Sequence, residues 1–179
     1  MNKIIFISGT PAAGKSTIGR RLAEHFPKSL HIRVDELRSH IVNGAAMPSL
    51  EWSYEAVNQF RLVRTTATQM AKLYADNGFD VVIDDVCVPE SFVDQYAELF
   101  QTPGVSRVLL TPSVAAITER LHKRQDPFDH FFLENNTAEW IYSYLQPMNK
   151  AGWIVIDSSN LTIEETTAEV LKRIDAQQK

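Results

Sequence analysis

Short runs of apolar residues alternate along the chain with longer segments in which apolar residues recur every three or four positions. Short apolar runs are typical of strands buried on both faces, and the longer spacing is typical of amphipathic helices. The pattern predicts five strands, at Ile4–Ile7, Leu30–Val34, Val81–Ile83, Val105–Leu110 and Trp153–Ile156. Because strands and helices alternate, we expect an α/β fold with a parallel sheet covered on both faces.

Helix signals fill the intervals between these runs. A helix after the first strand carries the apolar stripe Ile18, Leu22 and Phe26, and a long helix is expected over about Ser53–Asp76. A third is expected to start at Pro89, because proline suits the first helical turn. The last begins at Thr162, which has capping-box spacing to Glu165.

The segment between the first strand and its helix matches the pattern GxxxxGK[ST] at every fixed position. In such a loop the backbone amides and the helix N-terminus point at an anion. The residues expected to hold the phosphates are Gly9, Thr10, Pro11, Ala12, Ala13, Gly14, Lys15, Ser16 and Thr17. Lys15 would reach the β- and γ-phosphates and Ser16 would ligate Mg²⁺. The alternative is an ordinary glycine turn between strand and helix.

A strand that ends in two carboxylates, Asp84 and Asp85, resembles a Walker B element. A carboxylate at this place can hold Mg²⁺ directly or through water, and we assign that role to Asp84. Asp85 is expected on the opposite side of the strand. There it would bind the acceptor substrate, cap the following turn or simply be solvated.

Asp35 directly follows the second predicted strand, and Arg38 lies one helical turn later. The carboxyl ends of parallel strands form the ligand crevice, so Asp35 is expected near the γ-phosphate, where it would accept the proton of an acceptor hydroxyl. Arg38 would bind the substrate or balance the carboxylate. The alternative for Asp35 is a helix N-cap.

Arg120 and Arg124 lie four residues apart near the end of a predicted helix, so they share one side of it. Two arginines closing over a nucleotide would neutralise the charge that develops on the γ-phosphate oxygens. We therefore expect catalytic arginines and a lid over about residues 120–136. The alternative is a basic helix end favoured by the helix dipole.

Length and charge limit the function further. The 179 residues suit a single domain, 1–179, and the formal net charge of −4 provides no basic field for nucleic acid. No apolar stretch is long enough for a membrane span. One cysteine, Cys87, excludes an internal disulfide, which favours a cytoplasmic location.

The least regular part of the sequence begins at Asp35 and extends to Trp52, with Asn43-Gly44 and Pro48 inside it. Long irregular segments beside a ligand crevice often bind substrate. We expect the acceptor-side region at about residues 35–60. An ordinary surface connection is the alternative.

Taken in order, five segments make the chain similar to the small P-loop kinases related to nucleoside monophosphate, shikimate and gluconate kinases. The segments are GTPAAGKST at 9–17, VDELR at 34–38, VVIDDV at 81–86, ERLHKR at 119–124 and IDSSNLTIEET at 156–166. The chloramphenicol phosphotransferase-like branch resembles the chain most. This resemblance implies a three-layer P-loop NTPase fold with sheet order 2-3-1-4-5. It also implies ATP as donor, Asp35 as base, a lid carrying Arg120 and Arg124, and a loop at Ser158–Leu161 beside the adenine.

The expected activity is therefore transfer of the γ-phosphate of ATP, with Mg²⁺, to a hydroxyl of a small molecule such as an antibiotic, a sugar acid or a nucleoside-like compound. A P-loop ATPase acting as a regulatory or assembly module is one alternative, in which Asp85 would polarise water. A nucleotide or polynucleotide kinase is another. The chain lacks the glycine triplet of shikimate kinases and the DGxPR-like stretch of nucleoside monophosphate kinases after Asp84, which disfavours those two acceptors.

Overall fold

The computed structural model describes residues 2–46, 52–86, 90–124, 133, 139–140, 142–143 and 150–177. Five parallel strands form its sheet: β1 (Ile4–Gly9), β2 (Ser29–Arg33), β3 (Asp80–Asp84), β4 (Val105–Leu110) and β5 (Trp153–Ile156). Their order in the sheet is β2-β3-β1-β4-β5, which confirms the expected fold class and topology.

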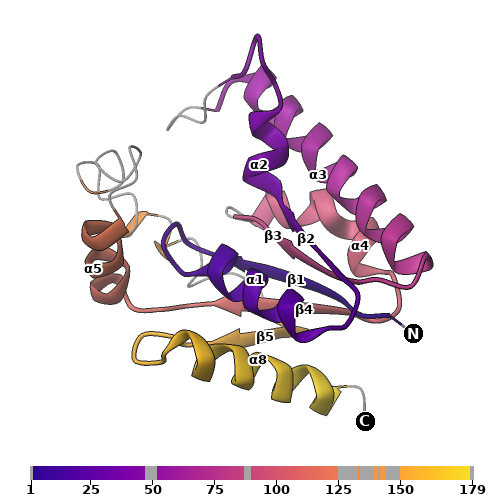
Figure 1. Ribbon diagram of the computed structural model, residues 1–179. Coiled ribbons are helices and arrows are strands. Elements are labelled where there is room, and N and C mark those ends of the chain that lie inside the picture. The colour runs from indigo at the N-terminus through magenta and orange to yellow at the C-terminus, as the bar shows by residue number, and fades with distance from the viewer. Residues whose placement is uncertain are drawn as a thin grey trace.

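Helices cover both faces of this sheet (Figure 1). One face packs against α1 (Lys15–His25) and α8 (Ile163–Gln177). The other packs against α3 (Tyr54–Asp76), the 3₁₀ helix η1 (Glu90–Tyr96) and α4 (Ala97–Phe100). Two shorter elements complete the order, α2 (Val34–Ser39) after β2 and α5 (Val114–Arg124) after β4.

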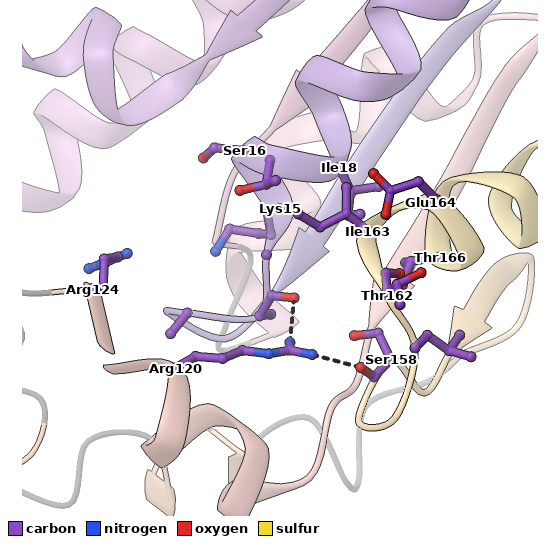
Figure 2. A pocket seen from close by; sticks show the side chains of 15 residues that line it. Lys15, Ser16, Ile18, Arg120, Arg124, Ser158, Thr162, Ile163, Glu164 and Thr166 are labelled. Carbon is purple, nitrogen blue, oxygen red and sulfur yellow. Dashed lines mark hydrogen bonds between the residues drawn. The ribbon is translucent and has the colours of Figure 1, made fainter. Parts of the chain in front are cut away.

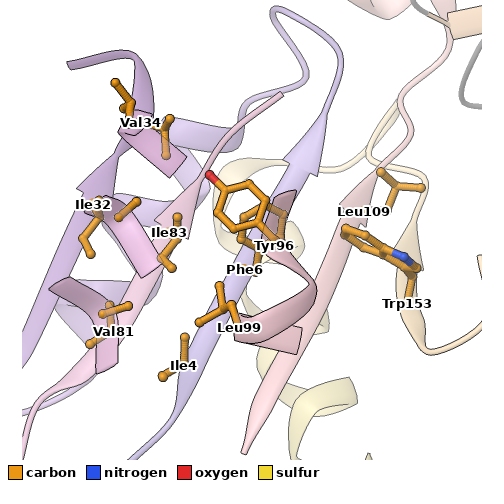
Figure 3. Packing of buried hydrophobic residues seen from close by; sticks show 13 residues of the cluster. Ile4, Phe6, Ile32, Val34, Val81, Ile83, Tyr96, Leu99, Leu109 and Trp153 are labelled. Carbon is orange, nitrogen blue, oxygen red and sulfur yellow. The ribbon is translucent and has the colours of Figure 1, made fainter. Parts of the chain in front are cut away.

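The central strand shows why the sheet needs helices on both sides. Ile4 and Phe6 belong to the core cluster under α3, whereas Ile5 and Ile7 belong to the cluster under α1 and α8, and all four are buried. Successive side chains of a strand point to opposite faces, so an uninterrupted apolar run must be buried twice. Phe6 stands beside Tyr96 in the first of these clusters, with the two ring centroids 4.6 Å apart (Figure 3).

Two of the predicted helix starts are confirmed by their capping bonds. The Ser53 side chain accepts a hydrogen bond from the Ala56 amide at 3.1 Å. At the start of α8, the Glu165 amide donates to Thr162 Oγ1 and the Thr162 amide donates to Glu165 Oε2. This exchange is the reciprocal capping box that the sequence predicted.

Two boundaries differ from the prediction. Val34 is the first residue of α2 rather than the last of the second strand. Its apolar side chain is buried at this position too, so the apolar pattern alone did not distinguish the two. The third helix is divided into η1 and the four-residue α4, although Tyr96 and Leu99 are both buried. Pro89 itself lies outside the described residues.

All five strands run the same way, so their carboxyl ends meet at one edge of the sheet. The phosphate loop, Asp35 and Asp84 each follow or end a strand at that edge. None of the helices in the described part of the chain is long and apolar enough to cross a membrane.

Candidate active site

The phosphate loop connects β1 directly to α1. Gly9 must lack a side chain, because a Cβ atom there would lie 2.6 Å from the Leu110 carbonyl oxygen of the neighbouring strand. Gly14 precedes the helix with φ of 95°, a left-handed conformation that favours glycine. As the N-cap residue, Gly14 has no side chain that could cap α1, which leaves the first helical amides available to an anion.

Lys15 is the first residue of α1 and only 8 % of it is exposed. Its Nζ donates to the Thr10 carbonyl oxygen at 2.9 Å, which holds the side chain across the loop. Burial lowers the pKa of this ammonium group, while the charges of Asp35, Asp84 and Asp85 act in the opposite direction. Lys15 therefore lies within the field of three carboxylates, an excess of negative charge that a bound divalent cation would balance.

Ser16 and Asp84 come together at the start of α1, where Ser16 Oγ donates to Asp84 Oδ1 at 3.0 Å. A hydroxyl and a carboxylate are oxygen donors of the kind that Mg²⁺ prefers. No cluster of three or more acidic, histidine or cysteine side chains suited to a metal occurs among the residues that the structure describes. This pair fits Mg²⁺ of the type that is held by few protein groups and completed by substrate phosphates and water.

Asp35 is the second residue of α2 and is exposed. The N-cap of this helix is Arg33, and no side chain caps the helix, so the N-cap alternative for Asp35 is wrong. Although Asp35 as a whole is exposed, the surrounding protein shields its carboxyl group from water and so raises its pKa, and the charges of Asp85 and Asp84 add to this effect. Lys15 and Arg38 oppose it. A carboxylate with a raised pKa is a better proton acceptor than an ordinary aspartate.

Arg38 extends from α2 toward α3. Its guanidinium lies 4.8 Å from the centroid of the Phe60 ring and donates to the Ala46 carbonyl oxygen. Arg38 Nε is buried and finds no hydrogen-bond partner among the residues that the structure describes. An unsatisfied charged donor in the predicted acceptor-side region suits a polar or anionic acceptor group.

Asp85 lies on the opposite side of β3 from Asp84, as the strand pattern predicted. It is 1 % exposed, so the interpretation of Asp85 as a solvated side chain is wrong. Arg64 Nε donates to Asp85 Oδ2 at 2.6 Å, and the Tyr96 hydroxyl donates to the same oxygen at 3.0 Å. The other oxygen accepts the Val86 amide at 2.7 Å, which agrees with a role in capping the next turn.

A cavity of about 580 Å³ opens beside the phosphate loop, within the range of ordinary ligand sites. Its lining includes Lys15 and Ser16 from α1, Arg120 and Arg124 from α5, and the start of α8 (Figure 2). Arg120 donates to the Ala13 carbonyl oxygen at 3.2 Å and to the Ser158 carbonyl oxygen at 2.7 Å. It therefore ties the phosphate loop to the loop after β5.

The lid prediction reaches beyond what the structure describes. Arg120 and Arg124 belong to α5, but residues 125–132 and 134–136 lie outside the described residues. The lid therefore stays a prediction. The loop at Ser158–Leu161 contributes Ser158 and Leu161 to the cavity, where the resemblance placed the adenine.

Two polar residues of the site were not predicted from the sequence. Arg64 occupies the buried stripe of α3, four residues after Phe60, and a charged residue on such a stripe is a usable signal for a buried ion pair. His31 lies on β2 with its Nε2 2.6 Å from Asp84 Oδ2. Its signal is weaker, because β2 is an edge strand and a single histidine there has no partner at a recognisable spacing in the sequence.

Comparison with known proteins agrees with this geometry. Over residues 4–148 the chain matches the model of a family described as "AAA domain". The chain belongs to this family. None of the curated proteins compared with the chain matches it.

Solved structures with the same fold include several kinases. A sugar kinase from Janibacter sp. HTCC2649 has a TM-score of 0.69 and 16% identity, covering 98% of this chain and 95% of its own. A gluconokinase from Sinorhizobium meliloti 1021 has a TM-score of 0.66 and 17% identity, covering 98% and 93%. A tunicamycin resistance protein from Deinococcus radiodurans has a TM-score of 0.67 and 15% identity, covering 99% and 95%.

These similarities show the P-loop kinase-like fold and agree with the broad resemblance found in the sequence. At such low identity they show the fold alone. The chloramphenicol phosphotransferase-like branch therefore stays a prediction.

Proposed function

We propose that this protein is a kinase that transfers the γ-phosphoryl group of ATP, with Mg²⁺, to a hydroxyl group of a small molecule. The proposal depends most on one observation. Asp35 lies just after β2 at the carboxyl edge of the sheet, and the pKa of its carboxyl is raised by shielding from water and by the charges of Asp85 and Asp84, against the opposing charge of Lys15. A proton acceptor beside a phosphate loop is what transfer to an alcohol requires.

Each charged residue has a part in this reaction. The acceptor oxygen attacks the γ-phosphorus as its proton passes to the Asp35 carboxylate. The bond from phosphorus to the β–γ bridging oxygen breaks, and its electron pair leaves with ADP. Lys15 and the amides at the start of α1 would bind the phosphates, and Arg120 and Arg124 would balance charge on the γ-oxygens.

Ser16 and Asp84 would hold the metal ion. Bound Mg²⁺ would supply charge neutralisation across the β- and γ-phosphates. The chain's own contribution is to fix two oxygen donors at the end of β3 and the start of α1, beside the phosphate loop.

The acceptor is expected on the α2 and α3 side of the site, near Arg38. Sugars, sugar acids and antibiotics are the first classes to test, because the structures of similar fold include a sugar kinase, a gluconokinase and an antibiotic-resistance protein. The unsatisfied Nε of Arg38 favours acceptors with a carboxylate or another electron-rich group near the reacting hydroxyl.

A hydrolytic ATPase is the less favoured alternative. In that alternative Asp85 would polarise the attacking water. Asp85 is only 1 % exposed and already forms an ion pair with Arg64, so it is poorly placed to contact water. A nucleotide or polynucleotide kinase stays open as a different choice of acceptor and is an outcome of the same test.

The test is a screen of sugars, sugar acids, nucleosides, antibiotics and an oligonucleotide with MgATP, following the mass of each acceptor. We expect one class to gain a phosphoryl group and ADP to form in equal amount. Asp35→Asn should bind ATP normally and lose transfer, whereas Glu36→Gln, a change at the neighbouring exposed carboxylate, should keep it. ADP formation that no acceptor alters would contradict the proposal, as would full transfer by Asp35→Asn.

A further inference from the structure

His31 makes the shortest contact of any side chain with the proposed metal ligand. It lies on β2, and its side chain is 8% exposed. Its Nε2 is 2.6 Å from Asp84 Oδ2, while the other carboxylate oxygen accepts from Ser16 Oγ at 3.0 Å. An ionised carboxylate only accepts hydrogen bonds, so Nε2 carries the proton. The two bonds therefore engage both oxygens of Asp84.

The helix α1 gives independent support for this arrangement. A Cβ atom at Gly19 would lie 2.6 Å from His31 Nε2 and 3.1 Å from His31 Cε1. Glycine is among the poorest helix formers, yet it occupies the middle of α1 at the point where the imidazole packs against the backbone. Gly19 therefore lowers the stability of α1 at the position where the His31 ring needs space to reach Asp84.

A bound carboxylate ligand works best when its orientation is fixed by a second residue. A hydrogen bond to Oδ2 stops the Asp84 carboxyl group from rotating and directs Oδ1 toward Ser16 and the phosphate loop. We propose that His31 is a positioning residue that orients Asp84 for Mg²⁺. This inference rests on the proposed function, because Asp84 needs orientation only if it serves a metal.

Two isosteric substitutions separate positioning from simple packing. Glutamine can place its amide nitrogen near the position of His31 Nε2, whereas asparagine reaches only to the position of Nδ1. Both introduce a polar amide of similar chemistry into the same partly enclosed place. If His31 positions Asp84, His31→Gln should keep much of the magnesium dependence of ATP binding, whereas His31→Asn should lose it.

The measured quantity is the magnesium coupling, defined as the ratio of the ATP dissociation constants in EDTA and in saturating Mg²⁺, determined by calorimetry. We expect His31→Asn to reduce this ratio by about 10–100-fold, the usual effect of losing a group that orients a metal ligand. ATP affinity in EDTA should stay near that of the wild type. His25→Gln, a change at the exposed histidine that ends α1, is the matched control.

Gly19→Ala tests the same claim without touching the histidine. Its methyl group should displace the ring and reduce the magnesium coupling, and the better helix propensity of alanine should offset part of the stability lost with the bond between His31 and Asp84. In a His31→Asn background the same substitution should leave the coupling unchanged, because the displaced group is gone.

The outcomes separate this inference from the proposed function. If the wild type shows no magnesium-dependent ATP binding, the proposed function itself is contradicted. If the wild type shows it and folded His31→Asn has the same magnesium coupling, only the role of His31 is overturned. A reduced coupling in His31→Asn that Gln restores supports positioning.

Discussion

Arg64 and Asp85 form an ion pair inside the protein, with Arg64 Nε 2.6 Å from Asp85 Oδ2 and both side chains 1% exposed. Arg64 also donates to Gln95 Oε1 and to the Val86 carbonyl oxygen, each at 3.0 Å. The guanidinium therefore connects α3 with the chain that follows β3. Asp84, one residue before Asp85, is the proposed metal ligand, so this pair also fixes the backbone at the metal site.

Removing one partner of this pair should destabilise the fold strongly. Arg64→Met leaves the Asp85 carboxylate buried without its cation, and we expect a loss of about 3–5 kcal/mol in the free energy of unfolding. Denaturant unfolding measures this loss. Arg61→Met changes an exposed arginine of the same helix and should have little effect. Equal stabilities of the two variants would contradict the importance of the buried pair.

Asp35 should set the acidic side of the pH profile. Its pKa is raised, and only the deprotonated form accepts a proton, so kcat/KM should rise with pH through a midpoint above the ordinary value of 3.8. The profile is measured with the acceptor identified by the screen. A midpoint at or below the ordinary value would exclude Asp35 as the base.

The same pKa shift predicts that Asp35 reduces stability at neutral pH. A carboxyl group whose pKa is raised on folding is disfavoured in its charged form, so the full penalty applies above the folded pKa and vanishes below the unfolded value. Asp35→Asn should therefore unfold at a higher temperature than the wild type at pH 7, and this advantage should disappear under acid conditions. Glu36→Gln is the control.

Lys15 should show a similar conflict between function and stability. Burial lowers its pKa, so the folded state disfavours the charged ammonium at neutral pH, and this penalty is relieved only as the pH rises toward 10.5. Lys15→Met should raise the melting temperature at pH 7 by about 2–4 °C for each kcal/mol relieved, and ATP binding should be lost. A lower melting temperature would mean that the hydrogen bond to Thr10 outweighs the burial of the charge.

Arg120 should act through its two carbonyl contacts as well as through its charge. Lysine keeps the charge but cannot reproduce a planar group that reaches both Ala13 and Ser158. We expect Arg120→Lys to weaken ATP binding by about tenfold, which corresponds to about 1.4 kcal/mol. Lys123→Arg, an exposed change on the same helix, should leave the affinity unchanged.

Much of the fold follows from local patterns that the sequence displays. The strand runs, the long helix from about Ser53 and the capping box at Thr162 are short-range features, and the structure confirms each of them. The sheet order was implied by the family resemblance, since alternation of strands and helices does not specify which strands are neighbours. The phosphate loop could be recognised from the sequence because its glycines and lysine occupy the fixed positions of the motif.

The parts that the sequence did not predict depend on contacts between distant residues. Arg64 meets Asp85 across 21 positions, and His31 meets Asp84 across 53. Neither residue shows in the sequence that it has such a partner, because the two residues of each pair become neighbours only in the folded sheet. The division of the third helix into η1 and α4 still buries one residue from each part, Tyr96 in η1 and Leu99 in α4.

The account depends above all on the binding of a nucleoside triphosphate by the loop from Gly9 to Thr17. Calorimetric titration of the wild-type protein with MgATP tests this most directly, with Lys15→Met as the matched variant. We predict saturable heat of association with one ATP per chain for the wild type and none for the variant. A wild-type protein that gives no heat with MgATP or MgGTP, or a variant that binds as tightly as the wild type, would contradict the account.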